Sequence, residues 1–352
     1  MATTTPDVKP EPAKSEAKAD GKPEPITAAG SRKEAVRYHE EDKLGPLGAK
    51  VSALWDPVDL RKMLVGEFNA AVARAKDAAS SVEQSATISV HEARKALRRA
   101  RAVLSMVSAA LPKSERRALR AALQEARRSL STARDHAVAP ETLAGIVLSD
   151  EDRATARRVL DNAAEALPPT QELKQLLAEA ATRAAAQAEA LEAALPRELP
   201  WKVVVDGIKD VYAEARKARR RGKTSKAWFH TWRRRTKELV YQLELVAEHA
   251  GQRLGAIHDE IEGIANTQSP AVDLIMLREF VNTYAQGIPV EAVEHLRDSL
   301  ESSVGELMTT ARDAGRDAFS QRPKRFAKRL SKAVKRDLTP PDEADLTTEL
   351  AD

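Results

Sequence analysis

The chain has 352 residues, of which 42% are hydrophobic, 4% are aromatic and none is cysteine. This length predicts one or two domains, and a composition dominated by Ala, Leu, Arg and Glu favours an all-α protein. The lack of cysteine excludes disulfides, thiolate metal sites and a cysteine nucleophile, and it fits a cytoplasmic protein. No run of about 18 apolar residues occurs, so the sequence predicts neither a signal peptide nor a transmembrane helix.

The formal net charge of +4 is distributed in blocks along the chain. Lys and Arg outnumber Asp and Glu by 12 to 4 over residues 91–135, by 11 to 2 over 214–238 and by 10 to 3 over 312–337. Residues 138–200 reverse this balance, at 6 to 11. Three basic blocks separated by neutral or acidic sequence predict that positive charge is concentrated on part of the folded surface.

The predicted elements in chain order are two tails and a series of helices. Residues 1–40 are rich in Pro, Lys, Glu, Ala and Ser, which predicts a disordered tail, and residues 338–352 predict a short acidic tail. Apolar residues at three- and four-residue spacing predict amphipathic helices near 60–80, 88–111, 114–135, 171–195, 202–220, 226–250, 271–285 and 290–318. No segment predicts a β-strand.

The second predicted helix contains SVHEARKALRRARAVL, residues 89–104, and carries a basic stripe. At 100° per residue, His91 and four cations share an arc of roughly 120°, and apolar residues occupy the opposite side. Ser89 and Glu92 fit a capping box, which would place His91 in the first helical turn, where free backbone N–H groups could meet an anion. The stripe consists of His91, Arg94, Lys95, Arg98 and Arg101.

A second copy of the stripe follows 139 residues later, in FHTWRRRTKELVYQLEL, residues 229–245. It consists of His230, Arg233, Arg234 and Lys237, and Tyr241 extends it. Two matched helical units predict pseudo-twofold packing that brings both stripes to one shared surface. Like charges on one arc repel each other and lack acidic partners on the helix, so an external anion is favoured over a purely solvated face.

Four motifs together resemble the CHAD family, the conserved histidine α-helical domain. They are H-x-x-R-K-x-x-R-R-x-R at 91–101, A-R-D at 133–135, H-x-x-R-R-x-x-K-x-x-x-Y-x-x-E at 230–244 and L-G-x-x-H-D at 254–259. The basic sequence RPKRFAKRL at 322–330 also resembles the usual end of that domain. One departure is Val240, because the family pattern usually has arginine before the tyrosine of the second stripe.

The resemblance covers residues 48–337 and implies an all-α fold of two pseudo-twofold-related four-helix bundles, with repeat halves at 48–200 and 201–337. It also implies a basic central groove that binds inorganic polyphosphate, and it suggests targeting to polyphosphate granules. Arginine suits such a ligand because its planar fork donates two parallel hydrogen bonds to phosphate oxygens. The residues expected at the site are His91, Arg94, Arg98, Arg101, His230, Arg233 and Lys237, then Lys95, Arg99, Arg134 and Arg234, with Tyr241 as a hydroxyl donor and Arg216, Arg220 and Arg329 as outer candidates.

Nucleic acid is the alternative partner, since basic helices also suit phosphodiester backbones, although no helix-turn-helix spacing, zinc-finger pattern or aromatic stacking run is present. We expect no enzymatic activity. The sequence HEARK begins like a zincin helix but lacks the second histidine, and no phosphate-binding P-loop motif occurs. We also expect no cofactor and no metal, because arginine neighbours repel cations. The sequence leaves the oligomeric state open.

Overall fold

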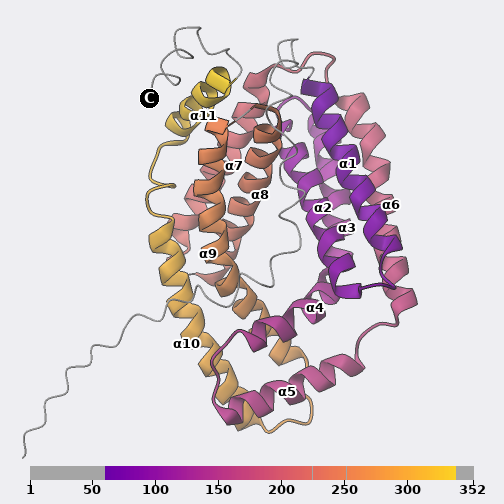
Figure 1. Cartoon of the computed structure of the whole chain (residues 1–352), viewed down its shortest axis with the longest axis vertical. Helices are drawn as coiled ribbons and strands as arrows, with labels where there is room; N and C mark the ends of the chain where they lie inside the picture. The colour runs from indigo at the N-terminus through magenta and orange to yellow at the C-terminus, as the bar shows by residue number, and fades with distance from the viewer. Residues whose placement is uncertain (1–59, 224, 251, 338–352) are drawn as a thin grey trace, which may run out of the picture. The chain divides into compact units, whose positions relative to one another are not determined.

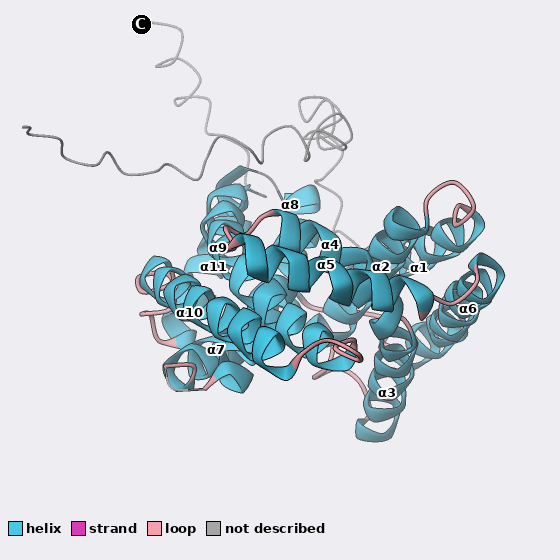
Figure 2. Ribbon diagram, turned by 90° about the horizontal axis from the view of Figure 1, so that it is seen from below, coloured by secondary structure: helices cyan, strands magenta, loops and turns pink. Residues whose placement is uncertain are grey.

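The computed structural model describes residues 60–337 except 224 and 251, so both predicted tails lie outside the described residues. All secondary structure in this part of the chain is helical, in eleven α-helices without a strand (Figure 1, Figure 2). This confirms the all-α prediction. None of the helices in these ranges is both long enough and apolar enough to cross a membrane.

The first half of the chain forms a four-helix group. Its members are α1 (Leu60–Ser80), α2 (Ala86–Met106), α3 (Lys113–Ser129) and α6 (Thr170–Ala194). Helix α1 packs on α2 and α6, and α3 packs on the same two helices. Each contributes a buried apolar stripe, represented by Phe68, Leu97, Leu123 and Leu177, which are at most 1% exposed. Burial of these stripes positions the polar face of α2 away from the core.

The second half forms a four-helix group with the same pairing. Its members are α7 (Trp201–Arg221), α8 (Lys226–Ala250), α9 (Gln252–Thr283) and α11 (Pro323–Asp337). Helix α7 packs on α8 and α11, and α9 packs on the same two helices, as α1 and α3 do in the first group. Trp232 is fully buried and stands edge-on to Phe229 and Phe319. The helix pairing therefore repeats, while the pseudo-twofold relation stays a prediction.

A third helical layer was not predicted. It consists of α4 (Ser131–Ala144), α5 (Asp150–Glu165), α10 (Val290–Ala314) and the last part of α9. These elements share a separate hydrophobic cluster that includes Leu143, Val159, Val281 and Leu300. In Figure 1, α4 and α5 lie below the two four-helix groups. The expected simple pair of bundles is thus extended by a layer built from both halves.

The two four-helix groups share one continuous hydrophobic cluster and meet along α2, which packs on α7 and α8. Gly207 lies directly against α2, where an added Cβ would be 2.2 Å from the carbonyl oxygen of Met106. The fully buried Gln242 side chain donates from Nε2 to Ser105 Oγ over 2.8 Å. These contacts place the two helices that carry the basic stripes side by side.

The start of α2 corrects one prediction. The N-cap is Ser85, whose hydroxyl accepts a hydrogen bond from Ile88 N over 3.4 Å, and the helix begins at Ala86. Ser89 is 2% exposed inside the helix, so the predicted capping box at Ser89 is wrong. Both serines satisfy the N-cap preference, and burial of Ser89 in the helix packing decides between them. His91 therefore lies beyond the free N–H groups of the first turn.

Candidate anion-binding surface

The two basic stripes come within electrostatic reach of each other where α2 lies beside α8. Burial, followed by the charge of Arg98 on α2, lowers the pKa of Arg233 on α8 to about 10. Burial and the charges of Arg233 and Arg98 lower the pKa of Lys237 to about 8. These residues and the basic side chains around them form what we call the central cationic cluster. It consists of His91, Arg94, Arg98, Arg101, Arg127, Arg134, His230, Arg233, Arg234 and Lys237.

Two arginines are held by matching hydrogen bonds in the two repeats. Arg94 Nη1 donates to the carbonyl oxygen of Leu130 over 2.9 Å, at the end of α3. Arg233 Nη2 donates to Ser269 Oγ over 3.1 Å. Both bonds join residues 36 positions apart, so the repeat extends to side-chain contacts. The Nε atoms of both arginines are buried without a hydrogen-bond partner among the described residues, so the two positions also share an unsatisfied donor.

Burial and mutual repulsion lower the pKa values of arginines in the central cationic cluster. Burial and the charges of Arg98 and Arg134 lower the pKa of Arg94 to about 9. Burial and the charges of Arg101 and Arg234 lower the pKa of Arg127 to about 10. These guanidinium groups stay charged at neutral pH and repel one another. A bound anion would relieve this repulsion.

The two histidines lie at equivalent positions and are both exposed at the surface. Loss of solvation, followed by the charge of Arg98, lowers the pKa of His91. Loss of solvation and the charges of Arg234 and Arg233 lower the pKa of His230. Neighbouring cations thus disfavour the protonated form of both imidazoles. The imidazoles are therefore mainly neutral at pH 7, and an anion that raises their pKa would protonate them.

Sequence reasoning missed Arg127, which enters the cluster from α3. Its charge acts on Arg94 and on His230, and Arg101 and Arg234 act on it in turn. The residue lies in the last turn of α3, where a cation also complements the helix dipole, so its local sequence gave it an ordinary explanation. The available signal was its place within the basic block 91–135.

Arg134 and Arg99, both predicted at the site, pair with carboxylates. Arg134 donates to Asp135 Oδ1 over 2.9 Å and to Asp273 Oδ1 over 2.7 Å, so it bridges α4 and α9 at the edge of the cluster. Arg99 donates to Glu244 Oε1 and Glu248 Oε1 over 3.0 and 3.1 Å and is 7% exposed. Arg99 therefore lies in the contact between α2 and α8. The prediction that its side chain faces the ligand is corrected.

The remaining residues of the two stripes differ in exposure. Lys95 and Arg101 are half-buried, and Arg101 lies near both Glu238 and Arg234. Tyr241 is 8% exposed and lies near Arg233, so its hydroxyl is largely enclosed. Val240 is 3% exposed within the core, so the family departure at this position adds apolar packing where an arginine was expected.

The three outer candidates lie in other surroundings. Arg329 on α11 pairs with Glu260 over 2.9 Å. Arg216 on α7 donates weakly to the carbonyl oxygen of Ser320 over 3.4 Å. Arg220, near the end of α7, lines a hollow that it shares with residues of α10. The structure does not bring these three residues into the central cationic cluster.

The L-G-x-x-H-D motif at 254–259 contributes the one grouping among the described residues with metal-ligand spacing. Ligand atoms of His258, Asp259 and Glu262 lie within 4.8 Å of one another, and Asp259 is exposed. His258 Nδ1 and Asp259 Oδ1 lie 3.0 Å apart and form a hydrogen bond with each other. We assign no metal to this exposed helix turn.

Fold and site together define an all-helical protein with clustered guanidinium, ammonium and imidazole groups where α2 lies beside α8. The sequence profile of the CHAD domain matches residues 67–282, and the chain belongs to the CHAD domain family. The fold is similar to the crystal structure of the CHAD domain from the plant Ricinus communis, with a TM-score of 0.54 and 18% identity, over 75% of this chain and 93% of that chain. A comparison with curated proteins gave no match.

Proposed function

We propose that this protein binds inorganic polyphosphate on the central cationic cluster. The observation that carries the proposal is a set of cations, where α2 lies beside α8, that form no ion pair with a carboxylate among the described residues. Among the described residues, no carboxylate forms an ion pair with Arg94, Arg98, Arg127, Arg233 or Lys237. Membership of a family linked to polyphosphate binding supports the same ligand.

The chemistry of the cluster suits a flexible polyanion. A polyphosphate chain carries about one charge on each internal phosphate, so it is held by many spaced donors. Arginines can each donate two parallel hydrogen bonds to phosphate oxygens, and Lys237 adds a compact charge. Because the donors come from α2, α3, α4 and α8, a chain lying across them would contact both repeats at once.

We propose a binding role without catalysis, in the cytoplasm and with association with polyphosphate granules. Release of phosphate from tripolyphosphate in the presence of magnesium would overturn the first part. Nucleic acid remains the rival ligand, since the cluster would also attract phosphodiester backbones. Competition between polyphosphate and DNA of equal phosphate content separates the two, and equal affinity would favour nucleic acid.

The decisive test is a salt-titrated binding assay with labelled polyphosphate. The variant combines His91→Ala, Arg94→Ala, His230→Ala and Arg233→Ala. Its control combines Arg117→Ala and Arg157→Ala, which remove two exposed cations elsewhere. We expect wild type and control to bind with affinity that falls steeply as salt rises, because bound phosphates release counterions. A folded quadruple variant with wild-type affinity would refute the site.

A further inference from the structure

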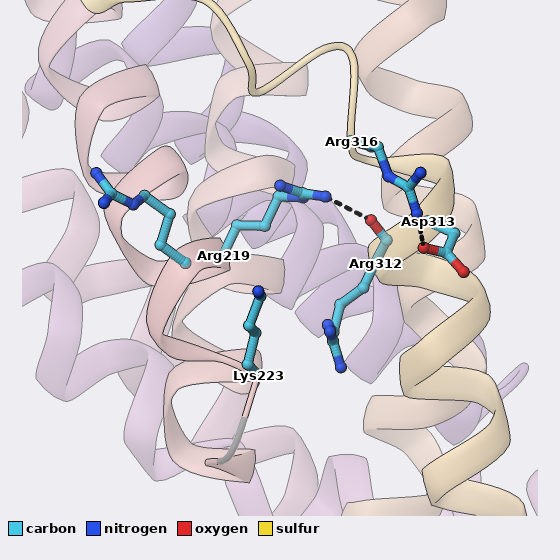
Figure 3. Close-up of a pocket in the computed structure, with 6 residues that line it drawn as sticks. Arg219, Lys223, Arg312, Asp313 and Arg316 are labelled. Carbon is cyan, nitrogen blue, oxygen red and sulfur yellow. Dashed lines mark hydrogen bonds and ion pairs between the residues drawn. The ribbon is translucent and has the colours of Figure 1, made fainter.

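A second concentration of positive charge lies between the C-terminal ends of α7 and α10. Side chains from both ends surround a hollow of about 590 Å³ (Figure 3). The residues that line it are Arg219, Arg220, Lys223, Arg312, Asp313 and Arg316. Five of these six side chains are cationic, so the hollow is an anion-attracting space in a different part of the fold from α2.

The contacts within the hollow leave most of this charge unpaired. Arg219 Nη2 reaches across to α10 and donates to the carbonyl oxygen of Arg312 over 2.7 Å (Figure 3). The carboxylate of Asp313 pairs with Arg316 over 2.5 Å. Lys223 points its ammonium group into the space between the two helices. Among the described residues, no carboxylate forms an ion pair with Arg219, Lys223 or Arg312.

Helix dipoles account for part of this arrangement only. The last turn of α7 carries Arg219, Arg220 and Arg221, and the last turn of α10 carries Arg312. The helix dipole favours cations at these C-terminal positions. The dipole explains why each end is basic. It does not explain why the two basic ends face each other, since this arrangement makes their cations repel. Burial and the charges of Arg312 and Arg316 lower the pKa of Arg219 as a result.

The hollow and the central cationic cluster lie on opposite sides of α8. The guanidinium carbon of Arg219 stands 5.9 Å from the ring centroid of Trp232. Trp232 is two residues after His230, about 200° around the helix, and points into the core. Gly315 presses the end of α10 against the same ring, where an added Cβ would be 2.6 Å from Cζ2. The buried indole therefore separates the two basic regions.

We propose that this hollow is a second, independent anion site that takes a compact linear triphosphate group. Several arginines around one half-open hollow suit an anion with many closely spaced oxygens. Among the described residues, none that lines the hollow is aromatic, so the phosphate chain, and not a nucleobase, is what it would recognise. Inorganic tripolyphosphate and the phosphates of a nucleoside triphosphate share this chemistry. The inference does not rest on the proposed function, since it uses different residues.

Hydrogen–deuterium exchange of the full chain with tripolyphosphate gives a local readout. We expect protection of peptides covering 219–223 and 312–316 in the wild type. The variant Arg220→Gln, Lys223→Gln and Arg312→Gln should lose this protection and require at least about tenfold more tripolyphosphate, as removal of charge-assisted contacts implies. The control Lys113→Gln, Arg117→Gln and Arg157→Gln removes three exposed cations elsewhere and should keep it.

Each outcome decides the inference. Absence of protection at the ends of α7 and α10 in the wild type, or equal protection in the triple variant, would overturn it. ATP should protect the same peptides as tripolyphosphate, and protection by ATP alone would also overturn it, because the base would then be required. Peptides of α2 and α8 report separately on the central cationic cluster. Failure of the proposed function would therefore be seen independently.

Discussion

Arg134 donates a hydrogen bond to Asp273 Oδ1 over 2.7 Å, and the two residues are 139 positions apart, the same offset that separates His91 from His230. Equivalent positions of the two repeats thus contact each other directly. The contact bridges α4 and α9 beside Arg94 and Arg233. It marks the place where the two halves of the chain meet at the central cationic cluster.

The substitution Asp273→Asn should have opposite effects on stability and on binding. It removes the ion pair with Arg134, which is partly exposed, so we expect a loss of about 1 kcal/mol in the free energy of unfolding. It also removes a carboxylate close to Arg233, so polyphosphate affinity should rise. Urea denaturation and anisotropy with labelled polyphosphate measure the two effects. Unchanged affinity would place the ligand away from this contact, and a fall would mean that Asp273 supports the site by holding Arg134.

Adjacent positions of α2 should give opposite results. Arg99→Gln breaks two ion pairs with α8, so it should lower the free energy of unfolding by about 2 kcal/mol and leave polyphosphate affinity unchanged. Arg98→Gln removes a cation of the cluster, so it should weaken polyphosphate binding about tenfold. Little stability should be lost, because the charge of Arg98 repels Arg233 and Lys237 in the free protein. The same two assays apply. The reverse pattern would mean that α2 presents a different face to the ligand.

Polyphosphate affinity should increase as the pH falls from 7.5 to 5.5. The pKa values of His91 and His230 are lowered in the free protein, and a bound polyanion raises them, so binding takes up protons. Above pH 8, loss of the Lys237 proton should weaken binding further, since burial lowers its pKa to about 8. Calorimetry in two buffers of different ionisation heat measures the proton uptake. The double variant His91→Gln, His230→Gln should abolish the uptake below pH 7.5, and its persistence would assign the protons elsewhere.

Two glycine substitutions should shift stability in opposite directions. In Gly207→Ala the new Cβ would meet the backbone of Met106, which cannot move freely, so we expect a loss of about 3 kcal/mol or more. In Gly305→Ala the Cβ has open space within α10, so a gain of about 0.5–1 kcal/mol is expected from helix propensity. Thermal and urea denaturation measure both. Tolerance of Gly207→Ala would mean that α2 and α7 can separate.

The contact between α5 and α10 should depend on pH through a buried carboxylate. Asp152 Oδ1 and Oδ2 accept hydrogen bonds from His295 Nδ1 and Ser299 Oγ, each over 2.8 Å. Burial alone would raise the pKa of Asp152, but these bonds lower it below the usual 3.8, while Asp152 raises the pKa of His295 above 6.5.

The sign of this dependence follows from the two shifts. The His295 contribution to stability is complete below pH 6.5 and is lost as the pH rises through its folded pKa, while the Asp152 contribution is present above pH 3.8 and is lost on acidification below it. The contact is therefore strongest between these values. After correction for intrinsic rates, amide exchange in α5 should be faster at pH 8 than at pH 6. Asp152→Asn should remove the difference, and its persistence in that variant would assign it to other groups.

The stripes on α2 and α8 were predictable because helical periodicity places residues at three- and four-residue spacing on one side. The sequence missed α5 although Ser149 caps it, accepting a hydrogen bond from Asp152 N over 3.1 Å, and three acidic residues follow in the first turn. Its buried face is short and rich in alanine, which gives a weak periodic signal. The sequence predicted a helix only near 271–285, yet α9 begins at Gln252 and continues through Pro270, because packing on α4 and α10 outweighs the lost hydrogen bond.

Tertiary contacts decided the details of the site that the sequence could not supply. Arg99 lies only 40° from Lys95 on the helical wheel, and the carboxylates of Glu244 and Glu248 draw it into the contact between helices. Arg127 reaches the cluster from α3, a helix that lacks the histidine-plus-basic pattern shared by α2 and α8. Arg220 belongs to a basic block that is continuous in sequence with the second stripe, but its side chain lines the hollow beside α10.

The hydrophobic cluster that runs unbroken through both four-helix groups has a consequence for how the chain can be divided. Dividing the chain near residue 200 would leave each fragment with an apolar surface that packs on the other fragment. Neither fragment alone could bury that surface away from water. Such fragments should be insoluble when produced separately and recover a folded protein when produced together. We therefore expect the two halves to behave as partners of an obligate pair that share one polypeptide.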